Sequence, residues 1–318
     1  MKVIDQLVPS TSTVAVIGEC MLELGLTAEL SATVSTSAEF GFGGDTLNMS
    51  VYLARLGSKV EYISALGDES LSDWMIDRWQ AEGVGCKHVF RHKSEVPGMY
   101  MIELDDFGER SFKYWRANSP AAKIIDDEEQ AAAVFEAISN YKTLFISGIS
   151  LAILQPLARE KMIAFLARYR KAGGRVVFDC NHRPNLWQSP QHASKCYEKV
   201  YQQTDIALPT FDDEQALFNY DSPEHAIKEI HDLGVKEIVL KLGEKGCMYS
   251  RDDEQGLVAV EPVKVVDTTS AGDSFNAGYL HSRLSGAEIG QACKNAHALA
   301  STVIQHRGAI IPREAMST

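Results

Sequence analysis

Short apolar runs alternate along the chain with segments whose apolar residues recur at helical spacing, and this alternation constrains the fold most. The runs are VAVIGE (14–19), EYISALG (61–67), TLFISG (143–148), RVVFDCN (175–181), DIALPT (205–210) and EIVLKLG (237–243). Such runs are typical of strands buried on both faces. The segments 46–57, 71–83, 127–139, 155–172 and 223–233 are predicted helices. Together they predict an α/β fold with a doubly wound, mostly parallel sheet flanked by helices.

Two segments break this alternation. Residues 98–116 alternate in steps of two on both sides of the turn-like DDFGE, which predicts a hairpin. The stretch after the first strand is rich in Thr, Ser and Val and lacks helical spacing. We expect these segments, about 22–43 and 90–117, to form a small sheet inserted in a single domain of residues 1–318. The pattern alone leaves open whether this sheet is a lid over the cleft at the strands' carboxyl ends or a decorative or dimer-forming element.

Composition excludes several classes of protein. The formal charge of −12 argues against nucleic acid or an anionic membrane as the main partner. Six separated cysteines without a C-x-x-C pair are typical of reduced thiols and indicate neither a disulfide framework nor a zinc site. Asp5 interrupts the first residues, MKVIDQLV, so we expect no signal peptide, and no apolar stretch is long enough to span a bilayer. We expect a cytoplasmic protein.

Common catalytic motifs are absent or imperfect. There is no Walker-type loop, and GFGGDT (41–46) fails the dinucleotide-binding pattern at Thr46. His88 and His92 are not expected to bind metal. GISLA (148–152) approximates the G-x-S-x-G elbow, which makes a serine hydrolase with Ser150 as nucleophile an alternative from another reaction class. Because the fifth position is Ala152, a simple strand-to-helix turn is the favoured interpretation.

The stretch DTTSAGDSF (267–275) suggests phosphate chemistry. Ser270, Ala271 and Gly272 are small enough for a ligand to approach the backbone, and the helix that follows would point its free amides at an anion. Asp273 would then be suited to accept a proton from an attacking hydroxyl. Taken alone, the stretch is equally compatible with Asp273 as a helix cap.

Other motifs fit the same site. LKLGEKG (240–246) has Lys241, Gly243 and Gly246 where backbone could surround a nucleotide, and GFGGDTLN (41–48) offers contacts to sugar hydroxyls. YWR (114–116) places Tyr114 and Arg116 on one face of the hairpin, and FDCNHRPNLW (178–187) ends a strand.

Together these motifs resemble the ribokinase, or PfkB, family of sugar kinases over nearly the whole chain. The pair GGDTLN and DTTSAGD, in that order, is specific to this family. GECMLEL, YWR, FDCNHRPNLW and STVIQHRGAIIPREAM are most similar to members that phosphorylate 2-keto-3-deoxy-D-gluconate (KDG). The resemblance implies a ribokinase-like fold with a lid and ATP-dependent transfer to the 6-hydroxyl of KDG, with Mg²⁺ and, in some relatives, K⁺. A fructokinase or ribokinase is the alternative within the family.

The resemblance also implies roles for individual residues. Asp273 would be the base and contact the substrate, with the amides of Ala271, Gly272 and Asp273 as an anion hole. The sugar acid would be held by Gly44, Asp45, Asn48, Tyr100, Tyr114, Arg116 and Arg183. ATP would lie against Asn181, Arg183, Lys241, Gly243, Gly246, Ser270, Ala271 and Gly272. Asp213 would act on Mg²⁺ through water, and Asp267, Thr269 and Gly308 stand where a monovalent cation binds in some relatives.

Arg116 indicates which kind of substrate the protein binds, and the small sheet indicates how two copies of the protein assemble. A carboxylate needs a bidentate donor, which Arg116 beside Tyr114 supplies, whereas a neutral sugar would not need one. A homodimer formed through the small sheet is also expected.

Overall fold

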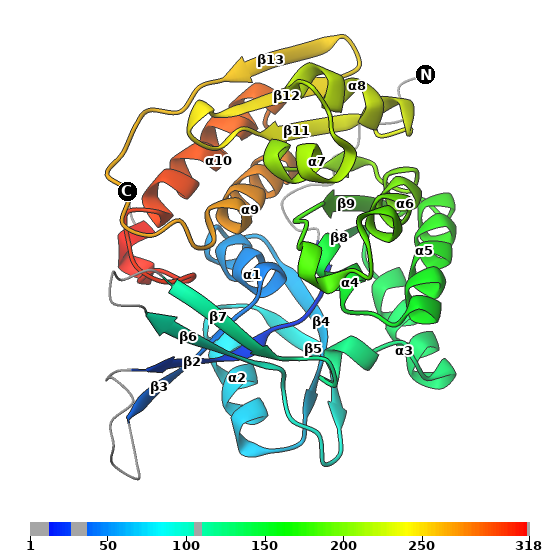
Figure 1. Cartoon of the computed structure of the whole chain (residues 1–318), viewed down its shortest axis with the longest axis vertical. Helices are drawn as coiled ribbons and strands as arrows, with labels where there is room; N and C mark the ends of the chain where they lie inside the picture. The colour runs from blue at the N-terminus through cyan, green and yellow to red at the C-terminus, as the bar shows by residue number, and fades with distance from the viewer. Residues whose placement is uncertain (1–12, 27–36, 105–109, 317–318) are drawn as a thin grey trace.

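Two sheets organise the chain in the computed structural model, which describes residues 13–26, 37–104 and 110–316 (Figure 1). The strands are β1 Val14–Ile17, β2 Met21–Leu26, β3 Ala38–Gly43, β4 Val60–Gly67, β5 Gly85–His92, β6 Met99–Leu104, β7 Arg110–Trp115, β8 Thr143–Ser147, β9 Arg175–Asp179, β10 Ile206–Ala207, β11 Glu237–Lys241, β12 Cys247–Arg251 and β13 Glu254–Val258. The helices are α1 Asp45–Arg55, α2 Ser70–Ala81, α3 Glu128–Ser139, α4 Gly148–Ala152, α5 Pro156–Lys171, α6 Pro190–Tyr201, α7 Phe211–Phe218, α8 Pro223–Asp232, α9 Ala271–Leu284 and α10 Ile289–Val303.

The large sheet has the order β13-β12-β11-β10-β9-β8-β1-β4-β5. All neighbouring strands from β11 to β5 pair in parallel, and β12 and β13 extend the sheet as antiparallel edge strands. The predicted α/β fold is therefore confirmed, and each of the six strands and five helices expected from the sequence is present within a few residues of its predicted bounds. The antiparallel extension was not anticipated.

Side chains on the two faces of the large sheet pack into two separate hydrophobic cores. In β1, Ala15 and Ile17 pack with residues of α3 to α8, whereas Val14 and Val16 pack with α1, α2, α9 and α10. Alternate residues of a strand point to opposite faces of its sheet. The sheet is therefore covered by helices on both faces, which explains why its central parallel strands are largely apolar.

The second sheet has four strands in the order β3-β2-β6-β7 and lies beside α1 and α2 (Figure 1). The predicted hairpin is β6 and β7, with Tyr100 opposite Tyr114, and its turn, 105–109, lies outside the described residues. β2 and β3 come from the stretch after the first strand, and β2 pairs in parallel with β6. β5 belongs to the large sheet, so the second excursion begins near Met99 and not at residue 90. That the chain is one domain stays a prediction.

All four connections between the two sheets meet at the buried Glu19. Its side chain, 1% exposed, forms an ion pair with Arg116 and accepts a hydrogen bond from Ser119 Oγ, both just after β7. A Cβ on Gly98, before β6, would lie 2.9 Å from Oε1 of Glu19, and one on Gly44, before α1, would overlap the carbonyl oxygen of Glu19. We call these five residues the Glu19 junction. The chain connections between the two sheets therefore converge on one place, in addition to the packing of Phe42 in β3 against Trp74 and Trp79 of α2.

Within the described part of the chain, no helix is both long enough and apolar enough to cross a membrane.

Gly148, the first residue of α4, is fixed by packing. A Cβ there would overlap the carbonyl oxygen of Cys180, whereas a Cβ on Gly25 would meet only one atom at ordinary contact distance. We therefore expect Gly148→Ala to lower the free energy of unfolding by about 1–3 kcal/mol, since backbone atoms must shift. Urea unfolding monitored by circular dichroism measures this, with Gly25→Ala as the control. Equal midpoints for the two variants would contradict the packing explanation.

Candidate active site

Asp273 lies in the first turn of α9, at the carboxyl ends of the central strands. Ser270, not Asp273, occupies the N-cap position. The Asp273 carboxylate instead faces α1, where its Oδ2 accepts a hydrogen bond of 2.9 Å from Asn48 Nδ2. A carboxylate engaged across the gap between two helices is not a local cap. The structure therefore brings together the two motifs, GGDTLN and DTTSAGD, that carried the family resemblance.

The electrostatic environment of Asp273 suits a base. Burial, followed by the negative charges of Asp45 and Asp179, raises its pKa from about 4 to about 7, while the hydrogen bond from Asn48 opposes this increase. A carboxylate with such a pKa is a stronger proton acceptor than an ordinary aspartate, yet part of it is ionised at neutral pH.

The N-terminus of α9 has the properties of an anion-binding site. The amides of the first helical turn have no partner within the helix, and the helix dipole favours negative charge there. Of the three amides expected to form the anion hole, that of Ala271 donates to the carbonyl oxygen of Thr268 at 3.2 Å. Ser270 adopts a φ of 65°, which is unusual for a residue other than glycine and costs about 1–3 kcal/mol. Ala271 and Gly272 follow with little or no side chain, so a ligand can approach the amides.

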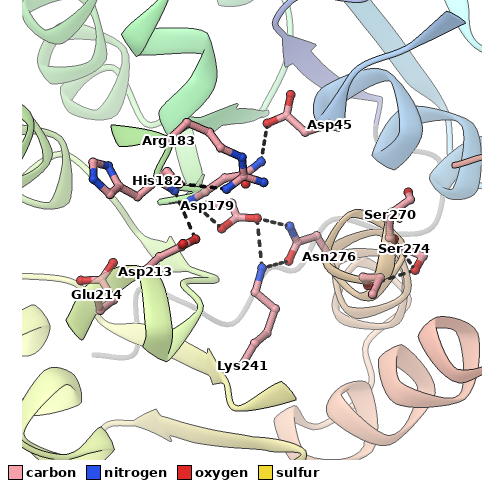
Figure 2. Close-up of polar contacts among 12 residues, drawn as sticks. Asp45, Asp179, His182, Arg183, Asp213, Glu214, Lys241, Ser270, Ser274 and Asn276 are labelled. Carbon is pink, nitrogen blue, oxygen red and sulfur yellow. Dashed lines mark hydrogen bonds and ion pairs between the residues drawn. The ribbon is translucent and has the colours of Figure 1, made fainter. Parts of the chain in front are cut away.

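Figure 2 shows a buried cluster beside this helix, formed by Asp179, Lys241 and Asn276. Lys241 Nζ donates to Asp179 Oδ2 at 3.0 Å and to Asn276 Oδ1 at 3.1 Å. Asn276 Nδ2 donates to the same Asp179 oxygen at 2.6 Å. The cluster links the carboxyl ends of β9 and β11 to the second turn of α9.

The loop after β9 contributes a second group of contacts. Asn181 has a φ of 34° and donates from Nδ2 to Asp45 Oδ2 at 2.8 Å. The His182 amide donates to Asp213 Oδ2 at 3.2 Å, and the exposed Arg183 donates to the His182 carbonyl oxygen at 2.9 Å. Burial raises the pKa of Asp213, and the charge of Arg183 opposes this increase.

The small sheet contributes Tyr100, Tyr114 and the adjacent Arg116. The two tyrosine rings lie 6.0 Å apart, and Tyr114 is 55% exposed. Tyr100 donates to Glu23 Oε2, and burial raises the pKa of its hydroxyl well above the usual range. Arg116, whose side chain is 12% exposed, pairs with Glu19, and its Nε has no hydrogen-bond partner among the described residues. The Nε–H group of Arg116 is therefore a donor without an acceptor among the described residues.

The structure gives packing reasons for part of the LKLGEKG segment. Gly246 has a φ of 95°, and a Cβ there would overlap the carbonyl oxygen of Val258. Gly243 has a φ of 59° and open space around it. The ammonium of Lys241 is occupied by the buried cluster. Of the three residues, Gly243 alone is exposed.

Ser150, the nucleophile of the serine hydrolase alternative, and the histidines considered for metal binding are engaged in contacts within the protein. Ser150 is buried and donates to the carbonyl oxygen of Ile17 at 2.8 Å, so GISLA is the short helix α4 with its serine engaged inside the protein. His88 contacts Tyr141 and His92 contacts Gln130. Across the described ranges, no group of three or more His, Cys, Asp or Glu side chains could enclose a metal ion.

The residues named for a monovalent cation do lie together. Asp267 Oδ1 accepts from the amide and hydroxyl of Thr269 at 3.0 and 2.6 Å, and Oδ2 accepts from the Gly308 amide at 2.8 Å.

Four residues near the site were missed by sequence reasoning: Glu19, Glu23, Asp179 and Asn276. Asn276 lies three residues after Asp273, so helical spacing could have placed both on one face. Glu23 is opposite Tyr100 in the β2–β6 pairing, which needed knowledge of a parallel pairing between distant segments. Nothing in the sequence links Asp179 to Lys241.

One protein that is similar in sequence to this chain is the 2-dehydro-3-deoxygluconokinase of Escherichia coli (strain K12). It is 49% identical over 312 residues, which cover 95% of this chain and 98% of that protein. The protein of the same name from Dickeya dadantii is 42% identical over 315 residues, covering 96% and 99% of the two chains.

Solved structures share the fold. A PfkB protein from Polaromonas sp. JS666 superposes with a TM-score of 0.81 at 25% identity, covering 97% of this chain and all of that one. A putative ribokinase II from Escherichia coli, in complex with ATP and Mg²⁺, gives a TM-score of 0.81 at 24% identity and covers 94% of each chain.

The fold and the site together define an α/β protein of the ribokinase-like class. The chain belongs to the pfkB family of carbohydrate kinases, whose model matches residues 11–316. The predicted family is confirmed, and with it the expected kinase activity.

The raised pKa of Asp273 predicts a stability effect. An aspartate in the unfolded chain loses its proton near pH 4, whereas Asp273 in the native protein retains it to about pH 7. Stability is therefore lost as pH rises through this window, since the native state must then hold a buried charge. Asp273→Asn is expected to raise the Tm at pH 7.5 by on the order of 2–4 °C, with a smaller gain at pH 5.

Thermal unfolding of wild type and Asp273→Asn at both pH values measures this difference. Asp77→Asn, which neutralises an exposed carboxylate in α2, is the control. A Tm for Asp273→Asn at pH 7.5 below that of wild type would contradict the expected destabilisation by the Asp273 charge.

Proposed function

We propose that this protein is an ATP-dependent kinase that phosphorylates the 6-hydroxyl of 2-keto-3-deoxy-D-gluconate, also called 2-dehydro-3-deoxy-D-gluconate. The products are 2-keto-3-deoxy-6-phosphogluconate and ADP. The observation that carries the proposal is the Asp273 carboxylate at the N-terminus of α9, held across from α1 by Asn48. Support for the substrate comes from relatives of 40–49% identity that are named as kinases of this compound.

The geometry assigns a proton transfer to Asp273. Asn48 occupies Oδ2, which leaves Oδ1 to accept the proton of the sugar hydroxyl. As this proton moves, the hydroxyl oxygen bonds to the terminal phosphorus of ATP, and the bond from that phosphorus to the leaving ADP oxygen breaks. The first-turn amides of α9 stabilise the charge on the transferring group, which is the main requirement of phosphoryl transfer.

The residues around α9 fit ATP, because the small side chains at 271 and 272 leave the first-turn backbone open to approach and the positive end of the helix dipole lies there. Mg²⁺ fits in the manner usual for nucleotide sites, where phosphates and water supply most of the ligands and the protein one or two carboxylates. Asp213 would act on this ion through water. When bound, Mg²⁺ would neutralise charge on the phosphates.

The sugar acid is proposed to lie between α1 and the small sheet. Gly44, Asp45 and Asn48 border this space from the side of α1, and Tyr100, Tyr114 and Arg116 from the sheet. We propose that the small sheet acts as a lid, because Tyr114 is largely exposed and Arg116 has an unused donor. Closure over the substrate would exclude water that competes as phosphoryl acceptor.

Two further expectations concern a monovalent cation and a homodimer. Asp267 already accepts two hydrogen bonds from Thr269 and one from the Gly308 amide, which follows α10, so the proposed mechanism contains no monovalent cation. A homodimer through the outer face of the small sheet is supported by Phe40 and Trp115, each 53% exposed.

The test of function is a panel of sugars and sugar acids assayed with ATP for ADP release. KDG is expected to be the preferred substrate, with fructose and ribose far less active. Asp273→Asn is expected to lower kcat by about 10²–10⁴, since the general base is lost, while the affinity for ATP changes by less than a few-fold. A kcat near that of wild type would exclude Asp273 as the base, and a preference for fructose would replace the proposed substrate.

Arg116 is expected to determine the preference for an acid. Arg116→Lys keeps a positive charge beside Glu19 but loses the planar donor pair, so kcat/KM for KDG should fall about 10- to 100-fold. The KM for ATP should change less than two-fold. Arg91→Lys, at an exposed ion pair in β5, is the matched control. Equal losses toward KDG and ATP would indicate that Arg116 supports the lid and not the substrate carboxylate.

A further inference from the structure

We propose that Asp179 and Lys241 are positioning residues, a buried ion pair that fixes the first turns of α9 and sets the charge around Asp273 without contacting either substrate. This inference rests on the proposed function only in taking Asp273 as the base. It changes the role of Lys241 from an ATP contact to a support of the helix that binds the phosphoryl group.

Burial and hydrogen bonding show that Lys241 is fully engaged inside the protein. Lys241 is 7% exposed, Asp179 4% and Asn276 1%. The three side chains satisfy one another through contacts of 2.6 to 3.1 Å that join β9, β11 and α9 (Figure 2). An ammonium that leaves this cluster to reach ATP would abandon a buried carboxylate, which is strongly unfavourable.

The cluster lies directly beneath the proposed anion hole. A Cβ built on Gly272 would be 3.7 Å from Lys241 Nζ, which places the ammonium next to the residue that precedes Asp273. Asn276, one turn further along α9, is bonded to both members of the pair. The position of the first turn relative to the strand ends is therefore fixed by these contacts.

Asp179 also orients the opposite side of the site. Its Oδ1 accepts a hydrogen bond of 3.2 Å from the amide of Asn181, whose side chain holds Asp45. Asp45 in turn begins α1, which carries Asn48 and its contact with Asp273. One carboxylate is thus connected to both helices that present groups to the reacting hydroxyl.

The ion pair of Asp179 and Lys241 affects the charge around Asp273. The groups that face Asp273 are Asp45, Asn48 and Tyr52 of α1, Asp179 of β9 and Ser270 before α9, with Lys241 below the preceding residue. Removing the Lys241 charge leaves Asp179 uncompensated and should increase the proton affinity of Asp273. Removing the Asp179 charge should decrease it. A residue that served packing alone would not give shifts of opposite sign.

The test compares the dependence of kcat/KM for KDG on pH, between pH 5.5 and 9, in Lys241→Met, Asp179→Asn and the double variant. Activity rises with pH as Asp273 loses its proton. This rise is expected to move upward by about 0.5–1 pH unit in Lys241→Met, downward by a similar amount in Asp179→Asn, and back near wild type in the double variant. Shifts in one direction only, or none, would overturn the inference.

Two further measurements keep the test decisive. Lys241→Arg keeps the positive charge beside Asp179, so its activity should rise at the same pH as in wild type even where the bulkier guanidinium lowers kcat. A large rise in KM for ATP in Lys241→Met with no shift in the pH profile would restore Lys241 as a nucleotide contact. If Lys241→Met does not fold, the downward shift in Asp179→Asn must still appear. Should wild type phosphorylate KDG and Asp273→Asn be inactive while no shift occurs, the proposed function stands and only this inference fails.

Discussion

The site depends on holding several carboxylates close together in a protein that is already strongly acidic. Asp45, Asp179, Asp213 and Asp273 all lie around the carboxyl ends of the central strands, and their mutual repulsion must be offset locally. Lys241, the amides of Asn48 and Asn181 and the positive end of α9 provide that compensation. At Asp273, burial and the remaining repulsion from Asp45 and Asp179 together raise the pKa of the carboxylate, which suits the base proposed for this position.

The two sheets divide the chemical work between them. The large sheet, covered on both faces, holds α1 and α9 in one core, and these helices carry the proposed base and the proposed anion hole. The small sheet has one exposed edge of aromatic side chains and a guanidinium that Glu19 fixes from the side of the large sheet. In the proposed mechanism, recognition of the acid and transfer of the phosphoryl group are carried by different parts of the fold, whose chain connections meet at the Glu19 junction.

Sequence reasoning was successful where a residue's role depends on its immediate neighbours. The apolar runs defined the parallel strands, and the small residues before Asp273 defined the helix start. It could not supply features that depend on tertiary contacts. The close approach of Val258, which requires a glycine at position 246, is not visible in the sequence. Nor is the ion pair of Lys241, because its partner Asp179 lies 62 residues earlier in the chain, at the end of another strand. The predicted contacts of Gly246 and Lys241 with ATP stay predictions. The strands β12 and β13 were missed because they lack the uninterrupted apolar character of the others.

The parallel pairing of β2 with β6 has a consequence for the order in which the protein folds. Leu22 pairs with Met99, and the chain between them forms α1, β4, α2 and β5 of the larger unit. Each hairpin of the small sheet closes a short loop, but joining the two hairpins requires that this intervening segment has already compacted. The small sheet is therefore expected to assemble late, after the core that carries α1. A newly made chain would acquire its phosphate-binding framework before it could enclose a substrate.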